Sequence, residues 1–166
     1  MAEMLDVYNL ATNEYEGRQL RSLCHGNPAL LHRTSQVVVI HPETGDVLLQ
    51  KRKLCKEIQP GKWDTAVGGH LDCGEDYLTC ALRELKEELG FSATSNMLEI
   101  LFDSKIRNEI ESEDVRVFGI KTAGPFIFQE SEIDEIKFWS KEELAQADKN
   151  IFTPNLVAQL KELKYL

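Results

Sequence analysis

Residues 69–91 read GHLDCGEDYLTCALRELKEELGF, and this stretch contains both the clearest helix of the chain and its densest group of acidic side chains. The helix is predicted over residues 76–89 and should end at Gly90, a residue type that favours the left-handed conformation at helix C-termini. Its apolar face is predicted to consist of four leucines: Leu78, Leu82, Leu85 and Leu89. Such a face indicates a helix packed against a core.

Three glutamates lie on the opposite side of this helix, within an arc of about 100°. They are Glu84, Glu87 and Glu88. Like charges three and four residues apart repel, and glutamates near a helix C-terminus oppose the helix dipole. For the helix taken alone, a solvated acidic face is the simpler interpretation. A hard divalent cation would instead turn the repulsion into a binding site, because Mg²⁺ and Mn²⁺ prefer oxygen ligands.

The residues before the helix decide between these interpretations. Gly69 is followed after five residues by Glu75, and after seven more by RELKEELGF at residues 83–91. The stretch resembles the Nudix box, G-x5-E-x7-R-E-U-x-E-E-x-G-U with U bulky and apolar, at every position. This resemblance implies an α/β Nudix fold, an α/β/α sandwich around a mixed β-sheet. It also implies hydrolysis of a diphosphate that is linked to another group, X.

The resemblance implies a role for each matching residue. Glu84, Glu87 and Glu88 would bind Mg²⁺ or Mn²⁺, and Glu84 or Glu87 would take the proton from the attacking water. The remaining conserved positions of the motif would be structural, with Glu75 and Arg83 orienting the carboxylates and glycines serving the turns at either end. These structural residues are Gly69, Glu75, Arg83 and Gly90.

Flanking segments over about residues 18–120 resemble a narrower branch, isopentenyl-diphosphate isomerase and its hydrolase relatives. The matching segments are Leu31-His32-Arg33, residues 48–52, residues 60–63 and Gly69-His70. The isomerase binds its metal with three histidines and two glutamates, and the positions that match are His25, His32, His70, Glu111 and Glu113. The cations expected to bind the diphosphate are Arg21, Arg52 and Lys56. Taken alone, His25 and His32 could be ordinary loop and strand-edge residues, and the acidic run 109–114 is typical of solvated surface. His70 directly follows the first glycine of the box and is the stronger candidate.

The sequence departs from the isomerase at the position of its catalytic cysteine, immediately before the glycine–histidine pair, where Gly68 stands. An aromatic residue expected after Thr153-Pro154 is also missing, because Asn155 follows. We therefore expect a metal-dependent Nudix hydrolase that cleaves a nucleoside diphosphate derivative or another X-diphosphate. Two alternatives stay open: an isomerase with a different acid–base pair, and a non-catalytic Nudix module that binds a nucleotide.

The remainder of the chain predicts the elements around the box. Six strand-like runs are rich in β-branched or aromatic residues and bounded by turn residues: 36–40, 47–51, 63–67, 98–102, 115–121 and 136–139. One further helix should begin at Ser140, where Glu143 completes a capping-box pattern. Another should begin at Thr153-Pro154, a cap followed by proline at the first helical position. This order predicts a mixed sheet covered by helices.

Composition and net charge limit the classes of binding partner that we expect. With 166 residues, 42% hydrophobic and 28% charged, the chain is expected to form a single domain, residues 1–166, with 1–34 as an N-terminal extension. A formal charge of −9 argues against nucleic-acid polymers and anionic membranes, but not against small-molecule diphosphates that arrive with a cation. Neither a signal peptide nor a membrane span of ~20 apolar residues is recognisable. We expect a cytoplasmic protein with reduced cysteines, and homodimer formation is left open.

Overall fold

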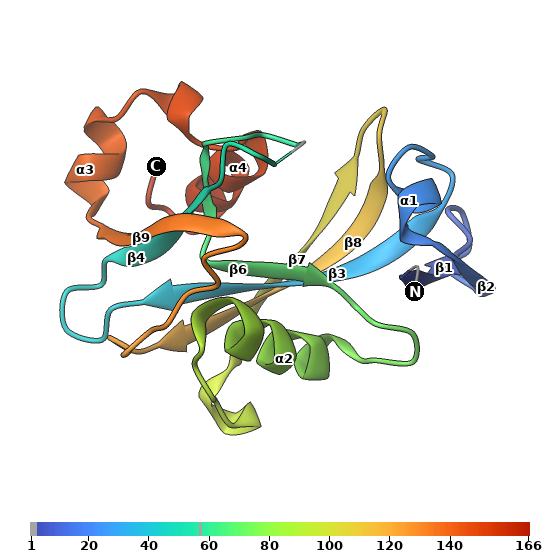
Figure 1. The fold of residues 1–166 in the computed structure, drawn as a ribbon, viewed down its shortest axis with the longest axis horizontal. Coiled ribbons are helices and arrows are strands. Elements are labelled where there is room, and N and C mark those ends of the chain that lie inside the picture. The colour runs from blue at the N-terminus through green and yellow to red at the C-terminus, as the bar shows by residue number, and fades with distance from the viewer. Residues whose placement is uncertain (1–2, 57) are drawn as a thin grey trace.

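The computed structural model describes residues 3–56 and 58–166, which form a mixed sheet with helices on both faces (Figure 1). The strands are β1 (Met4–Tyr8), β2 (Tyr15–Leu20), β3 (Leu31–Ile40), β4 (Val47–Arg52), β5 (Trp63–Thr65), β6 (Val67–His70), β7 (Glu99–Arg107), β8 (Ser112–Lys121) and β9 (Ile133–Trp139). The helices are α1 (Arg21–Cys24), α2 (Tyr77–Leu89), α3 (Lys141–Gln146) and α4 (Pro154–Glu162). Short 3₁₀ turns occupy Ser95–Met97 and Lys149–Ile151.

Strand β3 is the centre of the sheet. It pairs in parallel with β8 along its whole length and antiparallel with β6 over residues 34–37. Its last two residues pair with β4, which also pairs with β5 and β9, and its first residue meets β1. Strand β7 pairs with the other edge of β8. Residues that are distant in sequence, on β3, β6 and β8, are thereby brought side by side.

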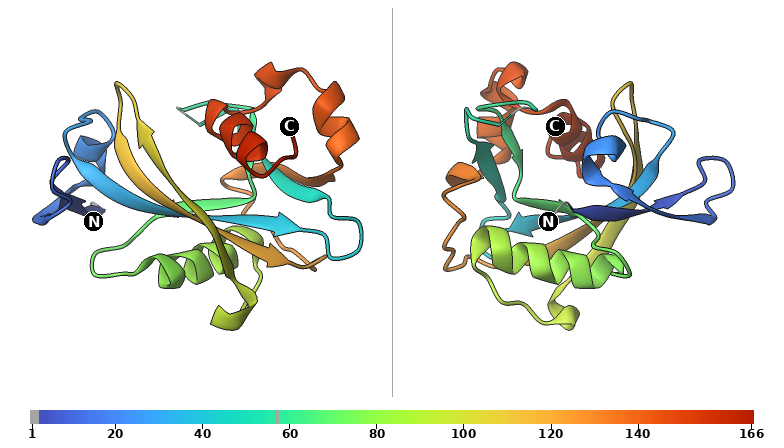
Figure 2. Two further views of the ribbon diagram at one scale, coloured as in Figure 1. Left: turned by 180° about the vertical axis from the view of Figure 1, so that it is seen from behind. Right: turned by 45° about the vertical axis from the view of Figure 1, so that its right-hand side comes forward.

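Both faces of β3 are covered, because successive side chains of a strand point to opposite sides. Val37 and Val39 pack in one core cluster with Leu85 of α2. Val38 packs in another with Leu160 of α4. Figures 1 and 2 show α2 on one side of the sheet and α3 and α4 on the other. The predicted α/β/α sandwich around a mixed sheet is confirmed.

The predicted helix ends agree with the structure. Asp76 caps α2 because its side chain accepts a hydrogen bond from the N–H of Thr79. Gly90 ends the helix in the left-handed region with φ 62°. Both hydrogen bonds of the capping box at Ser140 are present at the start of α3. Thr153 caps α4 ahead of its N-terminal proline. None of the helices in the described ranges is long and apolar enough to cross a membrane.

The apolar face of α2 differs in part from the prediction. Leu85 and Leu89 are fully buried, but Leu78 and Leu82 are only half-buried, and Ala81 takes the third core position. Residues 81, 85 and 89 are each four apart, so successive members of this series differ by only about 40° around the helix axis. All three pack in one core cluster with Val37 and Val39 of β3.

The largest differences from the predicted strands concern residues 63–67 and 36–40. Residues 63–67 form two strands, since β5 pairs with β4 while β6 pairs with β3. The run predicted at 36–40 begins at Leu31, because its polar first half also pairs with β8. The region predicted as an extension contains the β1–β2 hairpin and α1, held by a small core of Leu5, Val7 and Cys24. Both β5 and β6 contain buried residues within the run 63–67, so hydrophobicity alone could not locate the boundary between the two strands.

Candidate active site

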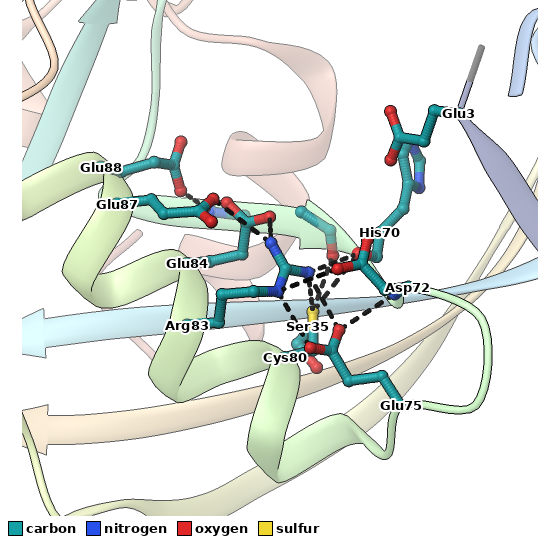
Figure 3. Close-up of polar contacts among 12 residues, drawn as sticks. Glu3, Ser35, His70, Asp72, Glu75, Cys80, Arg83, Glu84, Glu87 and Glu88 are labelled. Atoms are coloured by element: carbon teal, nitrogen blue, oxygen red, sulfur yellow. Dashed lines mark hydrogen bonds and ion pairs between the residues drawn. The ribbon is translucent and has the colours of Figure 1, made fainter. Parts of the chain in front are cut away.

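Arg83 ties the loop before α2 to the helix. Its Nε and Nη2 donate to the two carboxylate oxygens of Glu75, both at 2.9 Å, and Nη2 also donates to the carbonyl of His70 at 3.1 Å. The N–H of Asp72 donates to Glu75 as well. Burial alone would raise the pKa of Glu75, but the hydrogen bonds from Arg83 and Asp72 outweigh it and lower this pKa. Figure 3 shows this network below the box glutamates.

The three box glutamates project from α2 towards β6 (Figure 3). Nη1 of Arg83 lies 2.7 Å from Glu84 Oε1 and 3.2 Å from Glu87 Oε2. Glu88 is more enclosed: one oxygen accepts from the Gly68 N–H at 3.0 Å and the other from Gln50 Nε2 at 3.3 Å. Burial and the neighbouring charge of Glu84 raise the pKa of Glu88 to about 8.

Gly69 has a different role from the turn that the resemblance implied. It lies within β6, and its backbone is outside the left-handed region. A Cβ at this position would be 2.3 Å from Cδ of Glu84. Glycine is needed there because the glutamate lies directly against the strand. Gly90, in contrast, does adopt the left-handed conformation that ends the helix.

Three histidines and a glutamate meet beside the box. One possible ligand atom from each of His25, His32, His70 and Glu113 lies within 4.8 Å of the others. Nε2 of His25 is 2.8 Å from Nε2 of His70, and Nε2 of His32 is 3.0 Å from Glu113 Oε1. Glu111 Oε2 lies 3.8 Å from His25 Nε2. The structure therefore brings together the five residues suggested by the isomerase resemblance.

Strand register explains this convergence. His32 on β3 faces Glu113 on β8, and Thr34 on β3 faces His70 on β6. Facing residues point to the same side of a sheet, so three strands contribute to one cluster. His25 comes from the turn that ends α1. The acidic run 109–114 is consequently not all solvated surface, because Glu113 is only 5% exposed.

The electrostatics of the cluster suit a divalent cation. Burial lowers the pKa of the His70 imidazole to about 3, which keeps it neutral and able to coordinate a metal. Burial and the charge of Glu113 raise the pKa of Glu111, whose Oε2 is buried without a hydrogen-bond partner in residues 3–56 and 58–166. Burial opposes protonation of His32, but its hydrogen bond to Glu113 outweighs this and raises the pKa of the imidazole. Buried polar atoms are normally paired, so the orphaned carboxylate oxygen of Glu111 beside these imidazoles fits a divalent ion.

The three cations expected to bind the diphosphate each have a carboxylate partner. Arg21 Nη1 lies 3.0 Å from Glu3 Oε2, and Arg52 Nη1 lies 3.6 Å from Asp64 Oδ2. Lys56 is paired with Glu132. Burial lowers the pKa of Lys56, and the positive charges of Arg52 and Arg21 lower it further. Lys56 is therefore close enough to both arginines for their charges to act on it.

Sequence reasoning missed two polar side chains that hold the site residues. Gln50 bonds Glu88, and Thr34 Oγ1 is 3.2 Å from His70 Nδ1. Both are buried, but Gln50 directly follows an apolar run of β4, whereas Thr34 lies in the polar first half of β3. A polar residue next to an apolar run is the signal that could have identified Gln50, because burying it costs free energy unless it is hydrogen-bonded.

Comparison with known proteins identifies the family. Residues 31–160 match the family described as NUDIX domain. The chain is 33% identical over 163 residues to an uncharacterized Nudix hydrolase of Yersinia pestis, covering 95% of this chain and 82% of the relative. It is 33% identical over 147 residues to the uncharacterized Nudix hydrolase YfcD of Escherichia coli K12, covering 86% and 74%. The chain therefore belongs to the Nudix family.

Solved structures show the same fold at lower identity. The crystal structure of DR0079 from Deinococcus radiodurans superposes with a TM-score of 0.74 at 22% identity, covering 96% of this chain and 98% of that one. The NUDIX domain of Shewanella oneidensis NrtR, complexed with ADP ribose, gives a TM-score of 0.64 at 17% identity, covering 81% and 86%. At these identities the likeness is evidence of fold alone.

Proposed function

We propose that this Nudix protein is a divalent-metal-dependent hydrolase that cleaves a diphosphate linkage in a nucleoside diphosphate derivative or another small X-diphosphate. The observation that carries the proposal is the packing of Glu88 against β6 beside Glu84. Burying one carboxylate next to another is unfavourable without a counter-charge. A divalent cation would supply that charge, and the intact box supplies its oxygen ligands.

Different residues of the chain are proposed to position the metal and to accept the proton. Bound Mg²⁺ or Mn²⁺ would neutralise diphosphate oxygens and acidify a water molecule. Arg83 holds Glu84, while Gln50 and the Gly68 N–H hold Glu88. Glu87 has a side chain that is 53% exposed and a single contact with Arg83, so it is free to accept a proton. Glu84 or Glu87 is the proposed base.

A second metal position is proposed at the cluster of His25, His32, His70, Glu111 and Glu113. The orphaned oxygen of Glu111 and the four converging ligand atoms support it. Since His70 directly follows Gly69, this position adjoins the box. Arg21, Arg52 and Lys56 are the proposed diphosphate-binding residues, and each would exchange its carboxylate partner for a phosphate oxygen. These assignments rest on the isomerase-like arrangement of the flanking segments.

Hydrolysis is favoured over isomerisation because no thiol among the described residues replaces the one that Gly68 lacks. Cys80 is buried, and its sulfur lies 3.5 Å from the carbonyl oxygens of Gly69 and His70. Burial raises the pKa of this thiol to about 12, so it is a poor acid–base group. Cys73 donates to the carbonyl of Met4 on β1.

A substrate panel tests the proposal. The purified protein is incubated with nucleoside di- and triphosphates, ADP-ribose and isopentenyl diphosphate, with Mg²⁺ or Mn²⁺, and released phosphate or pyrophosphate and nucleotide products are measured. Metal-dependent release that a chelator stops is expected. Conversion of isopentenyl diphosphate to its allylic isomer without hydrolysis would favour an isomerase, and tight nucleotide binding without turnover would favour a non-catalytic module.

The single domain, the cytoplasmic location and the homodimer stay predictions.

Glu113→Gln is expected to remove one metal from the protein. The amide cannot supply the carboxylate charge that His32 contacts, so Mn²⁺ affinity at the second position should fall by at least about 10-fold. His70→Ala should act in the same way, since it removes an imidazole ligand. Bound Mn²⁺ is counted after equilibrium dialysis, with His41→Ala, on a turn outside the cluster, as the control. Unchanged metal content in both cluster variants would refute the second position.

Metal-free protein should become less stable as the pH rises through the titration of Glu88. The pKa of this carboxyl is raised from 4.5 to about 8, so its contribution to stability is present below pH 4.5 and is lost towards pH 8. Glu88→Gln does not titrate. The free energy of unfolding of this variant relative to wild type should therefore increase between about pH 6 and about pH 9. Urea unfolding in a chelator measures it, and an equal difference at both pH values would contradict the burial of this carboxylate.

A further inference from the structure

A cavity of about 350 Å³ lies away from the candidate active site. Arg33 on β3 and Tyr77, the first residue of α2, line it together with residues of β7, β8 and the turn after β1. Arg33 is adjacent to His32 in a strand, so the two side chains point to opposite faces of the sheet. The cavity is therefore on the α2 face, beyond the N-terminal end of that helix.

The two carboxylates that line this cavity are paired with arginines, whereas two of its cations have no such partner among the described residues. Arg116 forms two hydrogen bonds to Asp103, at 2.8 and 3.1 Å, and Asp114 is engaged by Arg107 at 2.8 Å. Both carboxylates of the lining are thus occupied. Two lining cations, Arg33 and Lys105, have no carboxylate within 4.0 Å in residues 3–56 and 58–166. Two unpaired cations beside one cavity are unexpected in a chain with a net charge of −9.

Arg33 is held by aromatic rings. Its guanidinium carbon lies 3.8 Å from the ring centroid of Tyr8 and 5.8 Å from that of Tyr77. Its Nε is buried and has no partner in the described part of the chain. Stacking on aromatic rings holds the guanidinium plane, and a buried donor without an acceptor is unfavourable. The arrangement leaves Arg33 prepared for an anion that is not part of this chain.

We propose that this cavity binds the phosphate group of a small molecule through Arg33 and Lys105. A planar guanidinium beside an ammonium suits phosphate, whose double charge would offset both cations. The volume falls in the range of small-molecule sites, so a phosphomonoester such as a nucleotide fits as well as free phosphate. This site is independent of the proposed hydrolysis.

Binding in a chelator, with no divalent metal, tests the site. Inorganic phosphate, adenosine monophosphate and adenosine are titrated into the full chain by calorimetry, and chemical shifts of backbone amides locate the binding. Saturable binding of a phosphate-bearing ligand but not of adenosine is expected, with shifts at Tyr77, Lys105 and Arg116. Tighter binding of adenosine monophosphate than of phosphate would identify a phosphomonoester site, and equal affinities a site for free phosphate.

Two charge-removing variants decide the assignment. Arg33→Met and Lys105→Met should each weaken binding by about tenfold or more, because each removes a charged hydrogen bond. Lys105 is exposed, so its variant tests the site even if Arg33→Met loosens the hairpin. Lys121→Met, at the far end of β8, is the matched control, and Glu87→Gln should bind as wild type does. No saturable binding, unchanged binding in Lys105→Met, or loss of binding in Glu87→Gln would overturn the proposal.

Discussion

Glu87→Gln is expected to lower kcat for metal-dependent hydrolysis by about 10²-fold or more, because it removes a charged metal ligand and a candidate base. The amide has nearly the same shape as the carboxylate. The side chain is 53% exposed and, in the part of the chain that the structure describes, its polar contact is with Arg83, so little packing changes. Stability should therefore shift by less than about 0.5 kcal/mol.

The measurement compares kcat, the melting temperature and Mg²⁺ affinity of the variant with those of wild type. Glu162→Gln is the matched control, because it makes the same chemical change on an exposed helical position of α4, away from the box. Wild-type turnover is expected for this control. Full activity in Glu87→Gln would refute the assignment of the box as the metal site, and parallel loss in both variants would point to a general effect of charge.

Helix boundaries and the box network could be predicted because their signals are local. Asp76 and Gly90 are recognisable as caps from their residue types and positions. The contact between Arg83 and Glu75 joins residues only eight apart, on a loop and the helix that follows it. Such short-range features need no knowledge of the sheet, and a motif of 23 residues contains all of them.

The histidine cluster depends on long-range pairing that spacing cannot reveal. His32 and Glu113 are 81 residues apart and meet only because β3 and β8 run parallel in one register. A shift of one residue would turn Glu113 to the other face of the sheet. Family resemblance suggested these positions, whereas charge patterning favoured solvated surface. Thr34, which contacts His70, had neither kind of signal, and the cavity at Arg33 arises from five separate elements.

Gly69→Ala is expected to abolish most of the activity while the fold is retained. The added methyl carbon would lie 2.3 Å from Cδ of Glu84 and 2.7 Å from its Cγ. The backbone at position 69 allows alanine, so only the flexible end of Glu84 has to move. That end is a proposed metal ligand held by Arg83. A displacement of about 1 Å in such a group can lower turnover by about 10²-fold.

Gly68→Ala is the matched control for this steric argument. A Cβ at position 68 would meet Gln36 Cγ at 3.5 Å, an ordinary contact, and the N–H that binds Glu88 is kept. The two variants differ by one residue along β6 and add the same atom. We expect similar melting temperatures, near-normal kcat for Gly68→Ala and a large loss for Gly69→Ala. If Gly69→Ala were fully active, Glu84 would tolerate displacement, and its place among the metal ligands would have to be abandoned.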